Sequence, residues 1–259
     1  MDLRKKLLVN HEICLGSFLN IPSASFIELI GYTGYDFNII DYEHGAYHYG
    51  MIEDCLRASQ ATNTPCIVRV GSTDGQTIAN VLDMGAHGIQ LPQITSTEGV
   101  EDVLDNIFFR PKGKRGYGST TRASRYGCLS RQEVIAKTEQ ETLVVVQLES
   151  VEGLERLAEI VKIPRVDLIF IGTGDLSLSL GYDSPNDERI LKILEKVVPQ
   201  ILKSNKVAGV FLSNPNWLNK LIDLGITYFA ISAAAVAKNA LKKQVEIFND
   251  AICRTENNK

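Results

Sequence analysis

Eight short runs of apolar and β-branched residues recur along the chain, separated by longer amphipathic stretches. This alternation is typical of a parallel sheet wrapped by helices, because each parallel connection needs a helical crossover. The runs that we interpret as strands are residues 12–19, 36–41, 66–70, 88–91, 143–149, 167–171, 208–212 and 227–231. Eight such units predict a single (β/α)8 TIM barrel domain over residues 1–259, and a doubly wound open sheet is the alternative.

Residues that favour helix ends lie between the predicted strands. Ser23, Asp74 and Ser96 each precede a segment of helical periodicity, as N-cap residues do. Glycine, which accepts the left-handed conformation that often ends a helix, stands before three of the strands, at Gly34, Gly85 and Gly225. A last helix is expected over residues 232–250.

The composition is that of an ordinary globular protein. With 44% hydrophobic residues, 22% charged residues and a formal charge of −4, the chain favours neither a nucleic acid nor a membrane as its partner. Its five cysteines are scattered, without a Cys-x-x-Cys pair, which indicates reduced thiols. The basic start has too short an apolar run for a signal peptide, and we expect a cytoplasmic protein.

Residues 108–128 interrupt the alternation with an irregular basic loop. Glycines and hydroxyl residues surround its six cations, which are Arg110, Lys112, Lys114, Arg115, Arg122 and Arg125. Two interpretations are open: a solvated surface loop, or a lid that clamps an anionic substrate.

Polar residues gather where predicted strands end, which is where parallel barrels carry their chemistry. Two of them, Glu149 and Asp175, follow neighbouring strands and could together hold a hard divalent cation such as Mg²⁺ or Mn²⁺. Such an ion would polarise a substrate carbonyl group. Taken singly, either acid could instead cap or begin the helix that follows its strand.

His44 follows the second predicted strand and is surrounded by acids, which favours it as a general base. The alternative is a structural partner of Glu43. Arg69 lies in an apolar run and needs an anionic partner there, either a substrate oxygen or a buried pair with Asp41 or Glu43.

The glycines of residues 172–177 (GTGDLS) lack the full pattern of a dinucleotide-binding loop. We expect Gly172 and Gly174 to let backbone amides approach a bound carboxylate instead.

Six ordered segments, at 39–45 (IIDYEHG), 66–74 (CIVRVGSTD), 81–94 (VLDMGAHGIQLPQI), 114–127 (KRGYGSTTRASRYG), 144–150 (VVVQLES) and 170–181 (FIGTGDLSLSLG), resemble the motifs of the HpcH/HpaI aldolase family. The resemblance covers nearly the whole chain. It implies a metal-dependent aldolase of the pyruvate type, assembled as a homo-oligomer, usually a hexamer, whose last helix is exchanged between protomers.

The resemblance also implies roles for individual residues. His44 matches the catalytic base, Asp83 the acid that raises its basicity, and Arg69 the group that stabilises the transition state. Glu149 and Asp175 match the metal ligands of the family, and Gln147 and the backbone at Gly174 match its contacts to the keto acid.

Two departures from the family pattern bear on the substrate. Tyr42 stands where glycine is common, which adds bulk, and Thr173 replaces a proline, which could loosen the turn before Asp175. Within the family the sequence is most similar to citrate synthases of siderophore biosynthesis, which join oxaloacetate to the acetyl group of acetyl-CoA. The basic loop 110–125 would then bind the CoA phosphates. The alternatives are an aldolase that cleaves a 4-hydroxy-2-keto acid to pyruvate and an aldehyde, and a noncatalytic barrel that binds a keto acid.

Overall fold

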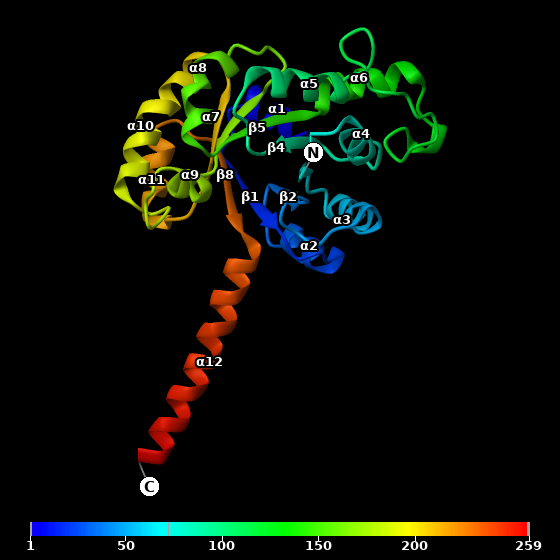
Figure 1. Cartoon of the computed structure of the whole chain (residues 1–259). Coiled ribbons are helices and arrows are strands. Elements are labelled where there is room, and N and C mark those ends of the chain that lie inside the picture. Colours follow the sequence, from blue (N-terminus) through cyan, green and yellow to red (C-terminus); the bar gives the residue numbers. More distant parts are fainter. Residues whose placement is uncertain (1, 72, 258–259) are drawn as a thin grey trace.

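The computed structural model describes residues 2–71 and 73–257, and it confirms the predicted barrel. Eight parallel strands pair in chain order and β1 closes on β8. Each strand lies within two residues of its predicted bounds: β1 Cys14–Leu19, β2 Phe37–Asp41, β3 Cys66–Arg69, β4 Gly88–Leu91, β5 Leu143–Leu148, β6 Leu168–Ile171, β7 Val207–Phe211 and β8 Tyr228–Ser232. Helices lie around the outside of these strands (Figure 1).

The connecting helices begin and end where the sequence indicates. The hydroxyl of Ser23, the carboxylate of Asp74 and the hydroxyl of Ser96 accept hydrogen bonds from the first turns of α2, α4 and α5. The helices are α1 Leu3–Leu8, α2 Ala24–Tyr32, α3 Tyr49–Ala61, α4 Gly75–Asp83, α5 Thr97–Ile107, α6 Arg131–Glu141, α7 Val151–Glu155, α8 Leu157–Ile160, α9 Thr173–Ser179, α10 Glu188–Lys203, α11 Leu218–Asp223 and α12 Ala233–Asn257. Among them, α2, α4 and α11 are followed by the predicted left-handed glycines, with φ from 93° to 95°.

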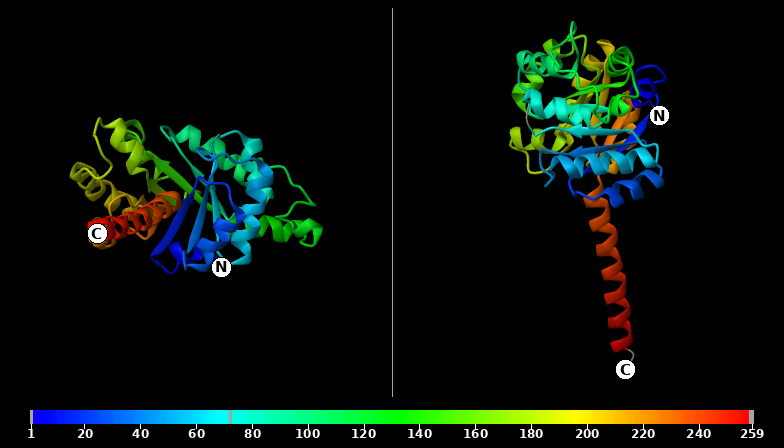
Figure 2. Two further views of the ribbon diagram at one scale, coloured as in Figure 1. Left: turned by 90° about the horizontal axis from the view of Figure 1, so that it is seen from below. Right: turned by 90° about the vertical axis from the view of Figure 1, so that its right-hand side faces the viewer.

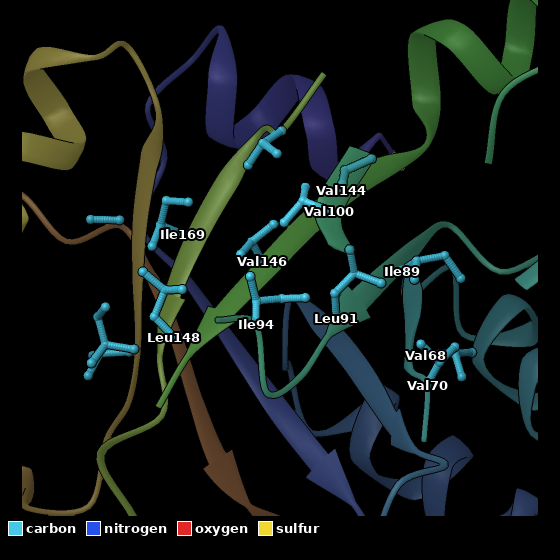
Figure 3. Close-up of a cluster of buried hydrophobic side chains, with 14 of the residues drawn as sticks. Val68, Val70, Ile89, Leu91, Ile94, Val100, Val144, Val146, Leu148 and Ile169 are labelled. Atoms are coloured by element: carbon cyan, nitrogen blue, oxygen red, sulfur yellow. The ribbon is translucent and has the colours of Figure 1, made fainter. Parts of the chain in front are cut away.

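Apolar side chains fill two layers of the barrel. The larger cluster lies between the strands and the surrounding helices, and Figure 3 shows Val68, Ile89 and Val146 within it. The smaller cluster lies inside the barrel, where Leu3 and Leu7 of α1 pack with residues of β2 and β8. Because α1 covers the amino-terminal end of the barrel, a ligand must enter from the carboxyl-terminal end.

Helix α12 projects away from the barrel (Figures 1 and 2). Several of its apolar side chains are exposed, including Leu241 at 69% and Phe248 at 66%. Contiguous exposed apolar side chains of this kind are uncommon on the surface of a monomeric protein.

The basic loop, residues 108–128, lies at the amino-terminal end of the barrel. Its backbone and cations contact the carboxyl-terminal ends of α3 and α4: Arg122 donates to the carbonyl oxygen of Met84 at 2.6 Å and to the side chain of Gln60. Within one chain the loop does not lie over the cavity, because α5 returns the chain to the opposite end before the loop begins.

No helix within residues 2–71 and 73–257 has the length and hydropathy needed to cross a membrane.

Candidate active site

A cavity of about 230 Å³ opens at the carboxyl-terminal end of the barrel. It brings together every predicted site residue except Asp83. The residues that line it are Phe18, Asn20, Asp41, His44, Arg69, Gln147, Glu149, Phe170, Gly172, Gly174, Asp175, Phe211 and Ser232.

Arg69 is buried at the end of β3, beside Asp41 in the register of the neighbouring strand. Its Nε donates to Asp41 Oδ1 at 3.0 Å, and its terminal nitrogens lie 2.8 Å from Asp41 Oδ2 and 3.0 Å from Glu43 Oε2. The guanidinium also lies 5.0 Å from the ring centroid of Phe18. Both partners weighed from the sequence are present, and the two carboxylates fix the direction of a planar group that still faces the cavity.

Glu149 is 5% exposed just beyond the end of β5. Its Oε1 accepts a hydrogen bond from the backbone N–H of Gln93 at 2.7 Å, and its Oε2 accepts one from the side chain of Gln147. Burial raises the pKa of Glu149, and the charges of Glu43 and Asp175 raise it further. Ser150, and not Glu149, caps the next helix, so a buried carboxylate that repels its neighbours is left facing the cavity.

Asp175 lies in the first turn of α9 and is exposed. The turn before it is held by Thr173, which is buried and whose hydroxyl donates to the carbonyl oxygen of Phe211 at 3.3 Å. This hydrogen bond of Thr173 holds the turn before Asp175, where the absence of proline was expected to loosen the backbone.

The two glycines beside these acids have different surroundings. A Cβ at Gly172 would lie 2.8 Å from Glu149 Oε2, so a side chain there would displace the carboxylate. A Cβ at Gly174 would meet no atom within 4 Å, so its backbone borders open space. The first glycine makes room for Glu149 and the second exposes backbone to a ligand.

The described residues contain no cluster of three or more His, Cys, Asp or Glu side chains that could enclose a metal ion. Glu149 and Asp175 fit a cation that takes two protein oxygens and fills its remaining positions with water and substrate, as Mg²⁺ commonly does.

The side chain of His44 is 61% exposed at the entrance of the cavity. Its backbone N–H donates to Asp41 Oδ1 at 3.2 Å, and its Nε2 lies 3.8 Å from Glu43 Oε2. A solvent-facing imidazole beside a carboxylate suits proton transfer. Of the other histidines, His48 caps α3 and His87 lies at the start of β4, away from the cavity.

Asp83 lies at the end of α4, at the amino-terminal end of the barrel. Its carboxylate pairs with the buried Arg115, and its carbonyl oxygen accepts the N–H of Ala123. A helix that follows β3 runs back toward the start of β4, so within one chain Asp83 and His44 lie at opposite ends.

Sequence reasoning missed one contributor to the site. Glu43 was considered as a partner of His44 and Arg69, and its carboxylate lies close to both groups. Gln93 was not considered at all, although it follows β4 at the same end of the barrel as the predicted residues. Its position after a strand was the available clue.

A closed parallel barrel with converging acids, an arginine and a histidine at the carboxyl ends of its strands defines a barrel enzyme. The chain belongs to the HpcH/HpaI aldolase/citrate lyase family, whose model matches residues 15–235. The members similar to this chain are aldolases and lyases, and the chain is an enzyme of this kind.

Individual relatives cover nearly the whole chain. A hydroxypyruvate/pyruvate aldolase of Roseobacter denitrificans is 30% identical over 88% of this chain and 89% of its own length. A 2-keto-3-deoxy-L-rhamnonate aldolase of Escherichia coli is 28% identical over 94% of this chain and 92% of its own. The crystal structure of citrate synthase SbnG superposes with a TM-score of 0.87 at 25% identity, covering 96% of this chain and 98% of that one.

Proposed function

We propose that the chain is a metal-dependent aldolase that cleaves a 4-hydroxy-2-keto acid to pyruvate and an aldehyde. The observation that carries the proposal is the placement of Arg69, Glu149 and Asp175 around one cavity. The names of the two aldolase relatives support this substrate class. Within a single chain the basic loop lies away from the cavity and offers no site there for the phosphates of acetyl-CoA.

Glu149 and Asp175 would hold Mg²⁺ or Mn²⁺ in this proposal. The ion, when bound, polarises the carbonyl oxygen of the keto acid and stabilises the negative charge that develops there. Gln147 holds Glu149 in place and, with the backbone at Gly172 and Gly174, is positioned to bind the oxygens of the keto acid.

Arg69 would stabilise charge on the substrate. A guanidinium carries five N–H donors in a planar fork, so Arg69 can hold its two carboxylates and still donate to a substrate oxygen. Since Asp41 and Glu43 fix its orientation before the substrate arrives, little reorganisation is needed as charge builds.

His44 would act as the base that takes the proton of the 4-hydroxyl group when the carbon–carbon bond breaks. The resemblance assigns Asp83 to raise the basicity of His44. Because the two lie at opposite ends of one chain, that contact requires Asp83 of a second copy.

We also propose a homo-oligomer, a hexamer by family resemblance, in which α12 packs on a second protomer. The exposed apolar residues of α12, including Leu241 and Phe248, support this proposal. Such an assembly could also bring the amino-terminal end of one barrel near the cavity of another.

The second candidate is a citrate synthase that joins oxaloacetate to the acetyl group of acetyl-CoA, as in the biosynthesis of the siderophore staphyloferrin B. The extensive structural likeness to citrate synthase SbnG favours it. Here the keto acid is the electrophile, and His44 would remove a proton from the acetyl group.

Two assays on the same purified protein separate the candidates. With Mn²⁺ and a 4-hydroxy-2-keto acid, the aldolase releases pyruvate, which lactate dehydrogenase detects. With oxaloacetate and acetyl-CoA, the synthase releases free CoA thiol. Thiol release without pyruvate release would replace the first candidate by the second, and unchanged turnover after metal removal by EDTA would contradict the metal role.

A further inference from the structure

Gln93 occupies the loop between β4 and α5 with an unusual backbone. Its φ of 55° lies in the left-handed region, which residues other than glycine, asparagine and aspartate seldom adopt. Strained backbone of this kind persists where surrounding contacts hold it, and it gathers at functional sites.

The left-handed backbone lets Gln93 donate in two directions. Its N–H donates to Glu149 Oε1 at 2.7 Å, and its side-chain Nε2 donates to Glu43 Oε1 at 2.7 Å. Chemistry fixes the orientation of the amide, because only the NH₂ group can face a carboxylate. A single residue thus connects the proposed metal ligand with the acid between Arg69 and His44.

Gln93 contacts only Oε1 of Glu43, so the second oxygen, Oε2, remains available to Arg69 and His44. Glu43 Oε2 lies 3.0 Å from the terminal nitrogen of Arg69 and 3.8 Å from Nε2 of His44. Because Gln93 holds Oε1, the carboxylate cannot rotate away from Arg69 without losing a charge-assisted hydrogen bond.

We infer that Gln93 is a positioning residue for the proposed reaction. It holds the carboxylate of Glu149 through its backbone N–H and the carboxylate of Glu43 through its side chain. The inference rests on the proposed function, since it assumes that Glu149 holds the metal and that Arg69 stabilises substrate charge. Nearby partners of catalytic and metal-binding groups commonly change activity or metal affinity by about 10- to 100-fold when they are removed.

Two variants separate the two contacts of Gln93. Gln93→Ala removes the side chain and keeps the N–H to Glu149, so we expect kcat to fall about tenfold while the Mn²⁺ Kd stays within about twofold. Gln93→Glu has the same size but places a second carboxylate against Glu43, so we expect a larger fall in kcat than for alanine. The readouts are steady-state kinetics and Mn²⁺ titration of the metal-free protein.

Asn205→Ala is the matched control, because Asn205 is also left-handed, with φ 56°, in an exposed turn after α10. We expect its kcat to be unchanged. Crystal structures of the wild type and Gln93→Ala supply a readout that needs no turnover: Glu43 should leave its single position in the variant while Glu149 stays.

The outcomes distinguish the inference from the function on which it rests. Wild-type kcat in both variants, or an unmoved Glu43 in the variant crystal, would overturn the positioning role. A wild-type protein inactive in both assays would refute the proposed function, and the crystal structures would still decide whether Gln93 holds Glu43.

Discussion

The two ends of the barrel use arginine–carboxylate pairs in different ways. At the amino-terminal end, Arg4 donates to both oxygens of Asp167 at 2.9 and 3.1 Å, and one of these oxygens also accepts the N–H of Val144. At the carboxyl-terminal end, Arg69 is held by Asp41 and Glu43 but borders an open cavity. Charges that fully satisfy one another stabilise a fold, whereas held charges that face a cavity are available for chemistry.

We expect the largest effect from a substitution of Arg69, the arginine that faces the cavity. Arg69→Lys keeps the positive charge near Asp41 and Glu43 but loses the planar fork of donors. We expect kcat/KM for the keto acid to fall by about 1,000-fold, because the stabilisation of developing charge depends on donor geometry. Circular dichroism should report a folded protein, and a loss below tenfold would contradict the role of Arg69.

A smaller effect is expected at the proposed metal site. Glu149→Gln preserves the size of the side chain but removes the charge that attracts a cation. We expect the Mn²⁺ Kd to rise by about 100-fold, as titration of the metal-free protein would measure. Glu152→Gln, a change in the following helix, is the control for charge alone. Equal effects of the two substitutions would indicate general attraction of the ion and not coordination by Glu149.

The fully paired arginine predicts the opposite outcome. Asp167→Ala removes three hydrogen bonds, two of them from Arg4, and leaves the cavity untouched. We expect the free energy of unfolding to fall by about 2 kcal/mol, after allowance for the partial exposure of Arg4, with kcat unchanged. Urea unfolding measures the first quantity, and a large loss of kcat would show that the two ends are not independent.

Sequence patterns locate residues along strands better than residues on helices and loops. The polar groups at the carboxyl ends of β2, β3, β5 and β6 line one cavity, because the carboxyl ends of parallel barrel strands meet at one mouth. Asp83 does not join them within the chain, since α4 carries it to the other end. Helical periodicity identifies a buried face but does not reveal which end of the barrel a residue reaches.

The basic loop and Gln93 show two further limits of the sequence. Charge alone left a surface loop and a clamp equally open for residues 108–128, and the direction of α5 places them at the amino-terminal end. The role of Gln93 depends on a left-handed backbone, which nothing in its residue type indicates. Both features arise from chain direction and local conformation, and neither is visible in composition.

The smallest effect is expected at His87, which lies at the amino-terminal end of the barrel and, unlike the exposed His44, is partly buried. Burial lowers the pKa of His87 to about 4, and its Nδ1 accepts the N–H of Cys66 at 3.2 Å, which requires an unprotonated nitrogen. In the unfolded chain His87 has a pKa of about 6.5, so the unfolded chain binds the proton more strongly than the folded protein. The contribution of His87 to stability is therefore fully present above about pH 6.5 and declines as the pH falls toward the folded pKa.

We expect the free energy of unfolding to include a loss of about 1 kcal/mol from this residue between pH 7 and pH 5.5. His87→Gln retains an acceptor for Cys66 and does not titrate, so urea unfolding of the variant should vary less with pH than that of the wild type. Equal pH slopes in the two proteins would mean that His87 titrates as it does in the unfolded chain, and that the amino-terminal end does not exclude a proton.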